Sequence, residues 1–225
     1  MTLAAATLST QNQMGFVEWQ RATWQNYVDS RDSLAPEQYR LFFHQGYLLI
    51  TEMGWEGINH ATICDLFTAI LYVWFSLHSD QVASSIGRCL LEKDTDTAGA
   101  PDLVLYLGDN YPRWQTGQPR RIDLSQWKAP DLVGEISDTT LASDLDEKKQ
   151  LYAALGIPEY WVIDVRGSRV FAFLLQDGRY QITETSAALK GLPIELLENT
   201  IAKLETDSNI SAAQWFNQQV IKLQG

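Results

Sequence analysis

Residues 130–164 constrain the fold of this chain more than any other stretch. The segment reads PDLVGEISDTTLASDLDEKKQLYAALGIPEYWVID, so two apolar runs are joined by a helical pattern. A helix over residues 143–155 places its leucines and Tyr152 on one arc. Lys148 falls near the centre of that apolar arc, with Asp144 one turn below it. Because a lysine rarely points into a core unless an anion lies there, the pattern indicates a buried anionic partner.

Glu135 is the first candidate for that partner. Residues of the strand expected over 132–137 alternate between two faces, with Glu135 on the face of Val133 and Ser137. Strand, turn and helix then bring Glu135 close to Lys148. Two interpretations follow from this pair: a buried ion pair that fixes the packing, or a site whose carboxylate holds a metal while the ammonium holds a water. The pair alone does not decide between them.

The length and composition favour one compact unit. A chain of 225 residues with 45% hydrophobic content can bury one substantial core, so we expect a single α/β domain over residues 13–225. Residues 1–12 are small and polar without periodicity, which predicts a flexible N-terminal arm. They lack the pattern of an export signal, and Cys64 and Cys89 form no CxxC or zinc spacing. A cytoplasmic protein with reduced thiols is the expectation.

The charge and the longest apolar stretch limit the partners. A formal net charge of -11 argues against indiscriminate nucleic-acid binding, because phosphate neutralisation supplies most of that affinity. The stretch over residues 63–77 is too short to span a bilayer and is interrupted by polar side chains, so no membrane partner is expected.

One loop departs from the acidic average. Residues 111–128 contain Trp114 and Trp127 among basic side chains, which makes this loop a candidate nucleic-acid contact. An ordinary solvated loop with two anchoring tryptophans is an equally good interpretation. The basic residues of this candidate contact are Arg113, Arg120, Arg121 and Lys128.

The remaining patterns predict helices and strands along the chain. A first helix is expected over residues 16–30, and a hairpin over 43–51 turns at Gly46. Asn59 is the expected N-cap of a long helix that extends to residue 77. Residues 92–101 read as a polar turn, and Gly156 caps a helix. The further strands are predicted over 82–91, 102–107, 132–137, 159–165, 169–175 and 179–183, and a closing helix is predicted over 211–223.

Two aspartates, Asp102 and Asp131, compete to partner Glu135. Asp131 and Glu135 are four residues apart on one strand, which separates them by about 13 Å, too far for one ion to bridge. Asp102 opens a different strand, and it lies beside Glu135 if the two strands pair. Carboxylates at such a short distance repel each other unless a cation lies between them. This arrangement therefore favours a metal such as Mg²⁺, which prefers hard oxygen ligands.

Four motifs together resemble a known family. They are the Pro-Asp step at 101–102, APDLVGEIS at 129–137, Asp144-x-x-x-Lys148-x-x-x-Tyr152, and GIPEYWVID at 156–164. In order and spacing they are similar to the Uma-type restriction endonuclease family, a branch of the PD-(D/E)xK nuclease superfamily, over roughly residues 46–175. The resemblance implies a restriction-endonuclease-like α/β fold, with a central mixed β-sheet flanked by helices and often assembled as a homodimer.

The same resemblance implies a mechanism. Asp102, Glu135 and the backbone carbonyl of Ile136 would ligate Mg²⁺, with Mn²⁺ as a substitute, to hydrolyse DNA phosphodiester bonds. Ser137 stands where the plain form of the superfamily has its catalytic lysine, and Lys148 supplies the ammonium from the next helix. RNA and branched DNA remain alternative substrates.

Further residues either support the predicted site or differ from the family pattern. The resemblance places His60 near the metal ligands, while Asp144, Tyr152 and Asp164 are assigned to support and packing. Asp138 stands where the family often has proline, and the hairpin lacks the family's acidic residue, having Phe42 and His44 there. Glu52 and Glu56 are the candidates for a third acidic ligand. The competing hypothesis is a catalytically silent nuclease fold that acts as a binding or assembly module.

Overall fold

The computed structural model describes residues 18–52, 57–93, 96–119 and 121–224. The arm predicted over residues 1–12 lies outside the described residues. Two six-stranded sheets and their helices form the described part of the chain.

The central sheet carries the motifs that the sequence singled out. Its strand order is β12-β11-β10-β9-β7-β4, and β9 and β10 are parallel while the other neighbours are antiparallel. The parallel pair requires a crossover, which the helices α3 (Leu141–Leu145) and α4 (Glu147–Leu155) supply. The strands are β4 (Ala83–Ser85), β7 (Leu103–Leu107), β9 (Leu132–Ser137), β10 (Glu159–Asp164), β11 (Arg169–Gln176) and β12 (Arg179–Thr183).

The second sheet has the order β1-β3-β2-β6-β5-β8. Its β2–β3 hairpin turns at Gln45 and Gly46, both with positive φ, so the predicted hairpin is confirmed. The strands are β1 (Gln20–Arg21), β2 (Tyr39–His44), β3 (Tyr47–Glu52), β5 (Leu90–Lys93), β6 (Thr97–Gly99) and β8 (Arg121–Asp123).

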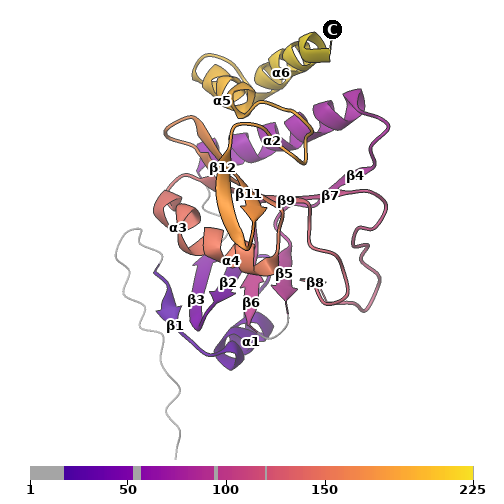
Figure 1. The fold of residues 1–225 in the computed structure, drawn as a ribbon. Coiled ribbons are helices and arrows are strands. Elements are labelled where there is room, and N and C mark those ends of the chain that lie inside the picture. Colours follow the sequence, from indigo (N-terminus) through magenta and orange to yellow (C-terminus); the bar gives the residue numbers. More distant parts are fainter. Residues whose placement is uncertain (1–17, 53–56, 94–95, 120, 225) are drawn as a thin grey trace, which may run out of the picture.

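The elements stack in layers (Figure 1). The helices α2 (Ile58–Leu77), α5 (Ile194–Ala202) and α6 (Asn209–Gln224) cover one face of the central sheet, with the short η1 (Lys203–Glu205) between the last two. The other face packs on α4 and the second sheet, and α1 (Trp24–Ser33) covers the far side of that sheet. The structure confirms the predicted α/β class with a central mixed sheet flanked by helices, and adds the second sheet and α5.

Several predicted boundaries are wrong. The first helix begins at Trp24 rather than residue 16, because Thr23 and Asn26 form a reciprocal capping box there. The long helix begins at Ile58, so Asn59 is not its N-cap. The helix predicted over 143–155 is two helices that break at Asp146, where φ is -122° and ψ is -85°.

Tertiary pairing explains two further differences. The strand predicted over 82–91 is divided between β4 in the central sheet and β5 in the second sheet, with Arg88 at φ 61° between them. An apolar run does not specify which sheet its residues join. Part of the polar turn predicted over 92–101 is the strand β6, which pairs with both β5 and β2. Asp94 and Thr95 of that turn lie outside the described residues.

The helix α2 is longer than the apolar stretch that predicted it. At 20 residues and a mean hydropathy of 1.4, it is long and apolar enough to cross a membrane by length and composition. Its buried side chains, including Leu66, Phe67 and Ile70, pack instead in the core formed with the central sheet and α6. This packing is that of a core helix.

Candidate active site

Asp102 and Glu135 meet across two neighbouring strands. The strands β7 and β9 pair antiparallel with Leu103 opposite Gly134, and Asp102 and Glu135 follow one position further along. The two residues are 3% and 1% exposed, beneath α4 and the second sheet. The structure therefore brings the predicted pair of carboxylates together. Asp131 does not join them, because it accepts hydrogen bonds from the Leu107 amide and from Lys128.

Lys148 reaches this pair from the first turn of α4. Its Nζ lies 3.2 Å from Oε2 of Glu135 and 2.8 Å from Oδ1 of Asp144. The proximity expected from the helical phase is present even though the helix breaks at Asp146. Burial opposes the charge of the ammonium, but Glu135 and Asp144 together hold the pKa of Lys148 above its usual value.

Arg40 is the site residue that sequence reasoning missed. Its Nη1 lies 2.8 Å from Oδ1 of Asp102 and its Nη2 lies 3.1 Å from Oε2 of Glu135, so one guanidinium bridges both acids. Its Nε donates to the carbonyl of Ala100 at 2.9 Å. A signal was available, because strand alternation puts Arg40 in phase with the buried Phe42. The identity of its partners depends on how the two sheets pack.

The ring of Phe42 contacts both cations of the site. Nζ of Lys148 lies 4.3 Å from the ring centroid, and the guanidinium carbon of Arg40 lies 5.5 Å from it. An aromatic face attracts cations electrostatically, more strongly where water is excluded. Phe42 was considered in the sequence only as a departure from an acidic position, and the structure shows it as the apolar wall beside the two cations.

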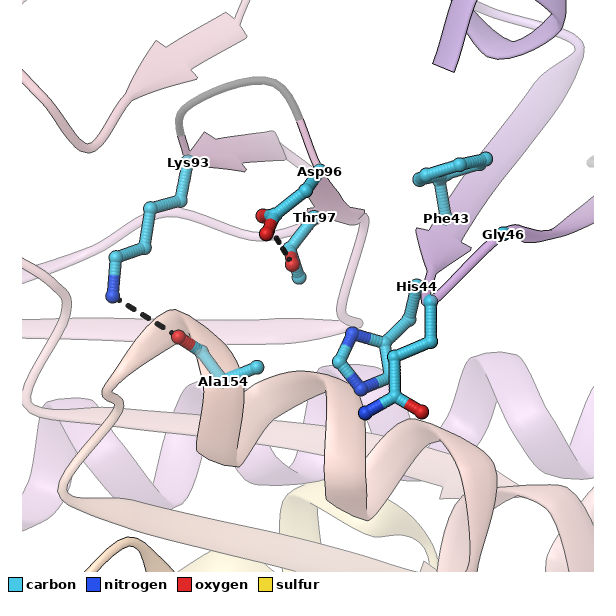
Figure 2. Close-up of a pocket in the computed structure, with 8 residues that line it drawn as sticks. Phe43, His44, Gly46, Lys93, Asp96, Thr97 and Ala154 are labelled. Atoms are coloured by element: carbon cyan, nitrogen blue, oxygen red, sulfur yellow. Dashed lines mark hydrogen bonds between the residues drawn. The ribbon is translucent and has the colours of Figure 1, made fainter. Parts of the chain in front are cut away.

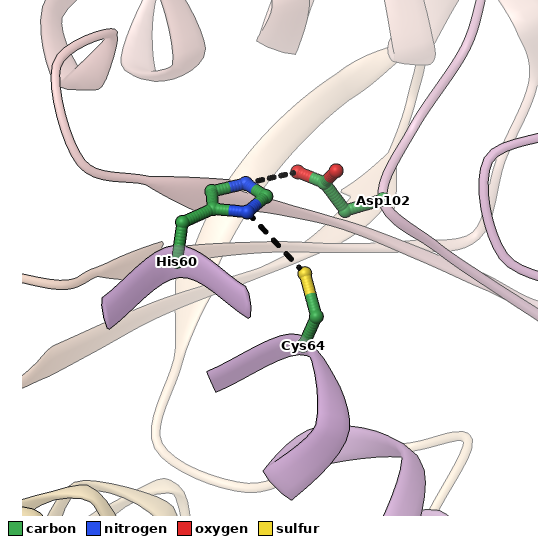
Figure 3. A group of neighbouring side chains, drawn as sticks. All are labelled: His60, Cys64 and Asp102. Atoms are coloured by element: carbon green, nitrogen blue, oxygen red, sulfur yellow. Dashed lines mark hydrogen bonds and ion pairs between the residues drawn. The ribbon is translucent and has the colours of Figure 1, made fainter. Parts of the chain in front are cut away.

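Asp102 is also held from α2. Nε2 of His60 lies 3.6 Å from Oδ2 of Asp102, and Nδ1 of His60 lies 3.6 Å from Sγ of Cys64 (Figure 3). Burial lowers the pKa of His60, but Asp102 and Cys64 raise it overall to about 10. The ligand atoms of the three side chains lie within 4.8 Å of one another, close enough to hold a metal. Each ring nitrogen already faces one neighbour, so the group acts as a support for Asp102.

The other predicted supports lie around Glu135 and Lys148. The hydroxyl of Tyr152 donates to Oε1 of Glu135, and Thr140 donates to Oδ2 of Asp144 at 2.6 Å. Asp164 caps its own turn through the amides of residues 166 and 167, away from this cluster. Tyr152 and Asp144 therefore contact the cluster, whereas Asp164 supports a different turn.

The two central carboxyl groups have opposite environments. Burial raises the pKa of Glu135 to about 7, against the opposing effects of Lys148 and Arg40. Burial also disfavours the charge of Asp102, but Arg40, His60 and the amide of Ile136 together hold the pKa of that carboxyl well below its usual range. Strong perturbation of neighbouring titratable groups is typical of functional sites.

The residues considered for a third acidic ligand do not enter the described cluster. Glu52 ends β3 and is exposed, and Glu56 lies outside the described residues. Asp138 pairs with Arg166 at 3.1 Å on the surface. The position that faces both acids from the hairpin carries Arg40, which is basic.

The basic residues of the loop over 111–128 have different partners. Arg121 pairs with Glu92 at 2.6 Å, Lys128 pairs with Asp131 at 2.7 Å, and Arg120 lies outside the described residues. Arg113 donates to the hydroxyl of Tyr111. Arg113 and Arg121 line a cavity of about 320 Å³. The aromatic side chains of that cavity are Trp114 and Trp127.

A larger cavity lies elsewhere. About 410 Å³ opens between the tip of the β2–β3 hairpin, the strand β6 and the end of α4, where Lys93 donates to the carbonyl of Ala154 (Figure 2). His44 and Asp96 line it, but Asp102, Glu135 and Lys148 do not. Cavity size alone therefore does not identify the buried acids and the buried lysine of the candidate site.

The fold and the site define an α/β protein of the restriction-endonuclease-like class. A search of solved structures finds a protein from Anabaena variabilis ATCC 29413 described as a "putative nuclease belonging to DUF820". The TM-score is 0.51 at 18% sequence identity, covering 80% of this chain and 98% of that one, which shows a shared fold. Residues 24–206 match the Uma2 family, described as "Putative restriction endonuclease", and the chain belongs to this family. No curated protein matches the chain.

Proposed function

We propose that this chain is a divalent-metal-dependent endonuclease that hydrolyses DNA phosphodiester bonds. The family and the fold support a nuclease. The observation that carries the proposal is the meeting of Asp102 and Glu135 from separate strands, with the ammonium of Lys148 3.2 Å from Glu135. Burying two acids beside a lysine costs desolvation free energy, and such a cost is common where a ligand or a reaction uses the charges.

The residues fit a hard divalent cation in donor type and in charge. Two carboxylates that face one another require a cation between them, and the guanidinium of Arg40 now supplies that charge. On the strand face of Glu135, the buried hydroxyl of Ser137 has no hydrogen-bond partner among the described residues. Asp102, Glu135 and the backbone carbonyl of Ile136 would hold Mg²⁺, or Mn²⁺ in its place. Such an ion polarises a scissile phosphate and lowers the pKa of a bound water.

The chain's own side chains would position the reacting groups. Lys148 donates toward Glu135 and would orient a water or neutralise charge on a phosphate oxygen. Tyr152 fixes the second oxygen of Glu135, and Asp144 fixes the lysine. His60 restrains Asp102. These contacts preorganise the trio, which is how electrostatic stabilisation contributes to rate.

The cleft beside the basic loop supports contact with a nucleic acid. Trp114 is 62% exposed and lines it together with Arg113, so a base could stack there while the guanidinium pairs with a phosphate. The net charge of -11 repels duplex DNA outside such a patch. A homodimer and a cytoplasmic location are parts of the same proposal.

The structure also favours one second candidate. Arg40 closes the network around Asp102 and Glu135, and each of the three side chains is at most 10% exposed. A closed ion network needs no metal. A catalytically silent nuclease fold that acts as a binding or assembly module would keep such a network for packing specificity.

Plasmid nicking separates the two candidates. The wild-type protein is expected to nick supercoiled DNA in the presence of Mg²⁺ or Mn²⁺, and EDTA is expected to abolish this nicking. The Glu135→Gln variant is expected to be inactive. Glu92→Gln, which alters a buried carboxylate in the second sheet, is the matched control and should retain activity. A folded wild-type protein that cuts neither DNA, RNA nor branched DNA with either metal would support the silent module.

A further inference from the structure

Arg40 stands between the two acids that the proposed function assigns to a metal. We infer that Arg40 is an internal competitor of the divalent cation, so that metal binds Asp102 and Glu135 only when the guanidinium leaves them. The inference rests on the proposed function for the identity of the ligands, but it concerns binding and needs no catalysis. It makes Arg40 the residue that sets the metal affinity of this site.

The four carboxylate oxygens of the pair are already assigned. Oδ2 of Asp102 accepts from the Ile136 amide at 2.8 Å and faces His60, while Oε1 of Glu135 accepts from Tyr152. The two remaining oxygens are the ones that Arg40 holds, and Nζ of Lys148 also lies 3.2 Å from Oε2 of Glu135. An ion that joins both acids through these two oxygens therefore takes the position of the guanidinium.

The charges favour exchange over addition. The cluster already holds cations, because Arg40 and Lys148 face the three acids Asp102, Glu135 and Asp144, and His60 lies 3.6 Å from Asp102. Replacing Arg40 by a divalent ion adds one positive charge to this cluster. Adding the ion with Arg40 in place adds two, and places a guanidinium against a metal among buried side chains. Like charges so close are strongly unfavourable there.

Arg40 is also the member of the cluster best placed to leave. It is the second residue of β2 and is 9% exposed, against 3% for Asp102, 1% for Glu135 and 3% for Lys148. Its departure gives up the hydrogen bond from Nε to the carbonyl of Ala100 as well as the two ion pairs. The Asp102 and Glu135 side chains are held in place by hydrogen bonds from β9 and α4, which stay when Arg40 leaves.

The test measures Mn²⁺ binding without nucleic acid, by calorimetry and by the metal-dependent shift in melting temperature. Arg40→Gln should bind Mn²⁺ about tenfold or more tightly than the wild type, because the competing state is removed. Arg169→Gln is the matched control, since Arg169 pairs with Glu198 on the surface, and it should bind as the wild type does. Adding Asp102→Asn to Arg40→Gln should abolish the gain.

Arg40→Lys provides a second variant that keeps a positive charge beside the acids. An ammonium lacks the planar fork that reaches both carboxylates at once, so this variant should bind Mn²⁺ with an affinity between those of the wild type and Arg40→Gln. Equal Mn²⁺ affinity in all three proteins, or absence of binding in Arg40→Gln while it is folded, overturns the inference. Tighter binding by Arg40→Gln with no cleavage of any substrate would support the inference and contradict the nuclease. DNA cleavage together with equal Mn²⁺ affinity in the wild type and Arg40→Gln would support the nuclease and contradict the inference.

Discussion

Two buried charge clusters on the same fold invite comparison. In the Glu92 cluster, Glu92 accepts from the Tyr27 hydroxyl at 2.5 Å and pairs with Arg31 at 2.9 Å and Arg121 at 2.6 Å. One buried acid therefore faces two guanidinium groups, and the contacts tie α1 and β8 to β5. In the Asp102–Glu135 cluster, made of Asp102, Glu135, Asp144, Arg40 and Lys148, three buried acids converge.

The difference shows that burial and pairing do not by themselves mark a functional site. Both clusters contain a nearly inaccessible glutamate and a bridging arginine. A single buried acid lies between the two guanidinium groups around Glu92, because Asp32, the other partner of Arg31, is exposed. Three buried acids converge in the Asp102–Glu135 cluster, so a divalent ion that replaces Arg40 finds two carboxylates as ligands. The number of converging buried carboxylates separates a structural network from a candidate metal site.

The largest expected effect is on catalysis. Lys148→Ala should lower the rate of plasmid nicking by about 10²–10³-fold, because it removes a preorganised charge from the developing negative charge on the phosphate. Lys93→Ala is the matched control, since Lys93 donates to a backbone carbonyl at the other end of α4. Full activity in a folded Lys148→Ala protein would rule out the assigned role of this lysine.

The second-largest expected effect is the gain in stability on metal binding, which should depend on one cluster and not on the other. Mn²⁺ at about one hundred times its dissociation constant should raise the free energy of unfolding by about 2.7 kcal/mol. Asp102→Asn should abolish the accompanying rise in melting temperature, and Glu92→Gln should retain it. Thermal unfolding with and without Mn²⁺ measures both. A rise that survives in Asp102→Asn would place the ion elsewhere.

The Glu92 cluster should contribute to stability without contributing to chemistry. Glu92→Gln removes the buried acid that Arg31 and Arg121 share and should lower the free energy of unfolding by about 1–3 kcal/mol, measured in urea. Its nicking rate should equal that of the wild type once both proteins are folded. A loss of activity larger than the loss of folded protein would contradict the division between the clusters.

A buried carboxylate outside both clusters extends the comparison to pH. Glu159 accepts from the Trp161 indole at 2.7 Å and from the amides of Ala187 and Ala188. Burial raises the pKa of Glu159 despite these bonds. The folded state therefore binds its proton more tightly than the unfolded state, and this contribution to stability is lost as the pH rises from the ordinary carboxyl range through the raised pKa.

Glu159→Gln should remove that part of the pH dependence. The difference between the two proteins in free energy of unfolding should change by about 1 kcal/mol or less across the window, because hydrogen bonds to the carboxylate oppose the effect of burial. Urea unfolding from about pH 4 to pH 8 measures it. A difference that stays constant over this range would contradict the raised pKa.

The sequence predicted the parts of the fold that depend on local periodicity. The alternation of β9, the hairpin at Gly46 and the cap at Gly156, which has φ 77°, follow from side-chain phase and backbone freedom. The division of residues 82–91 between two sheets was not predicted, because an apolar run is compatible with either partner. The helix α5 was also missed.

For the candidate site, the sequence alone predicted the acids and the lysine. Lys148 on an apolar helical arc and Asp102 before a strand are local facts, and the family motifs contain both. Only the tertiary structure decided that Arg40 from the second sheet lies between them. The reason is physical: a strand's period assigns a side chain to a face, whereas the charge it meets there depends on which sheet packs opposite, and that contact joins residues far apart in the chain.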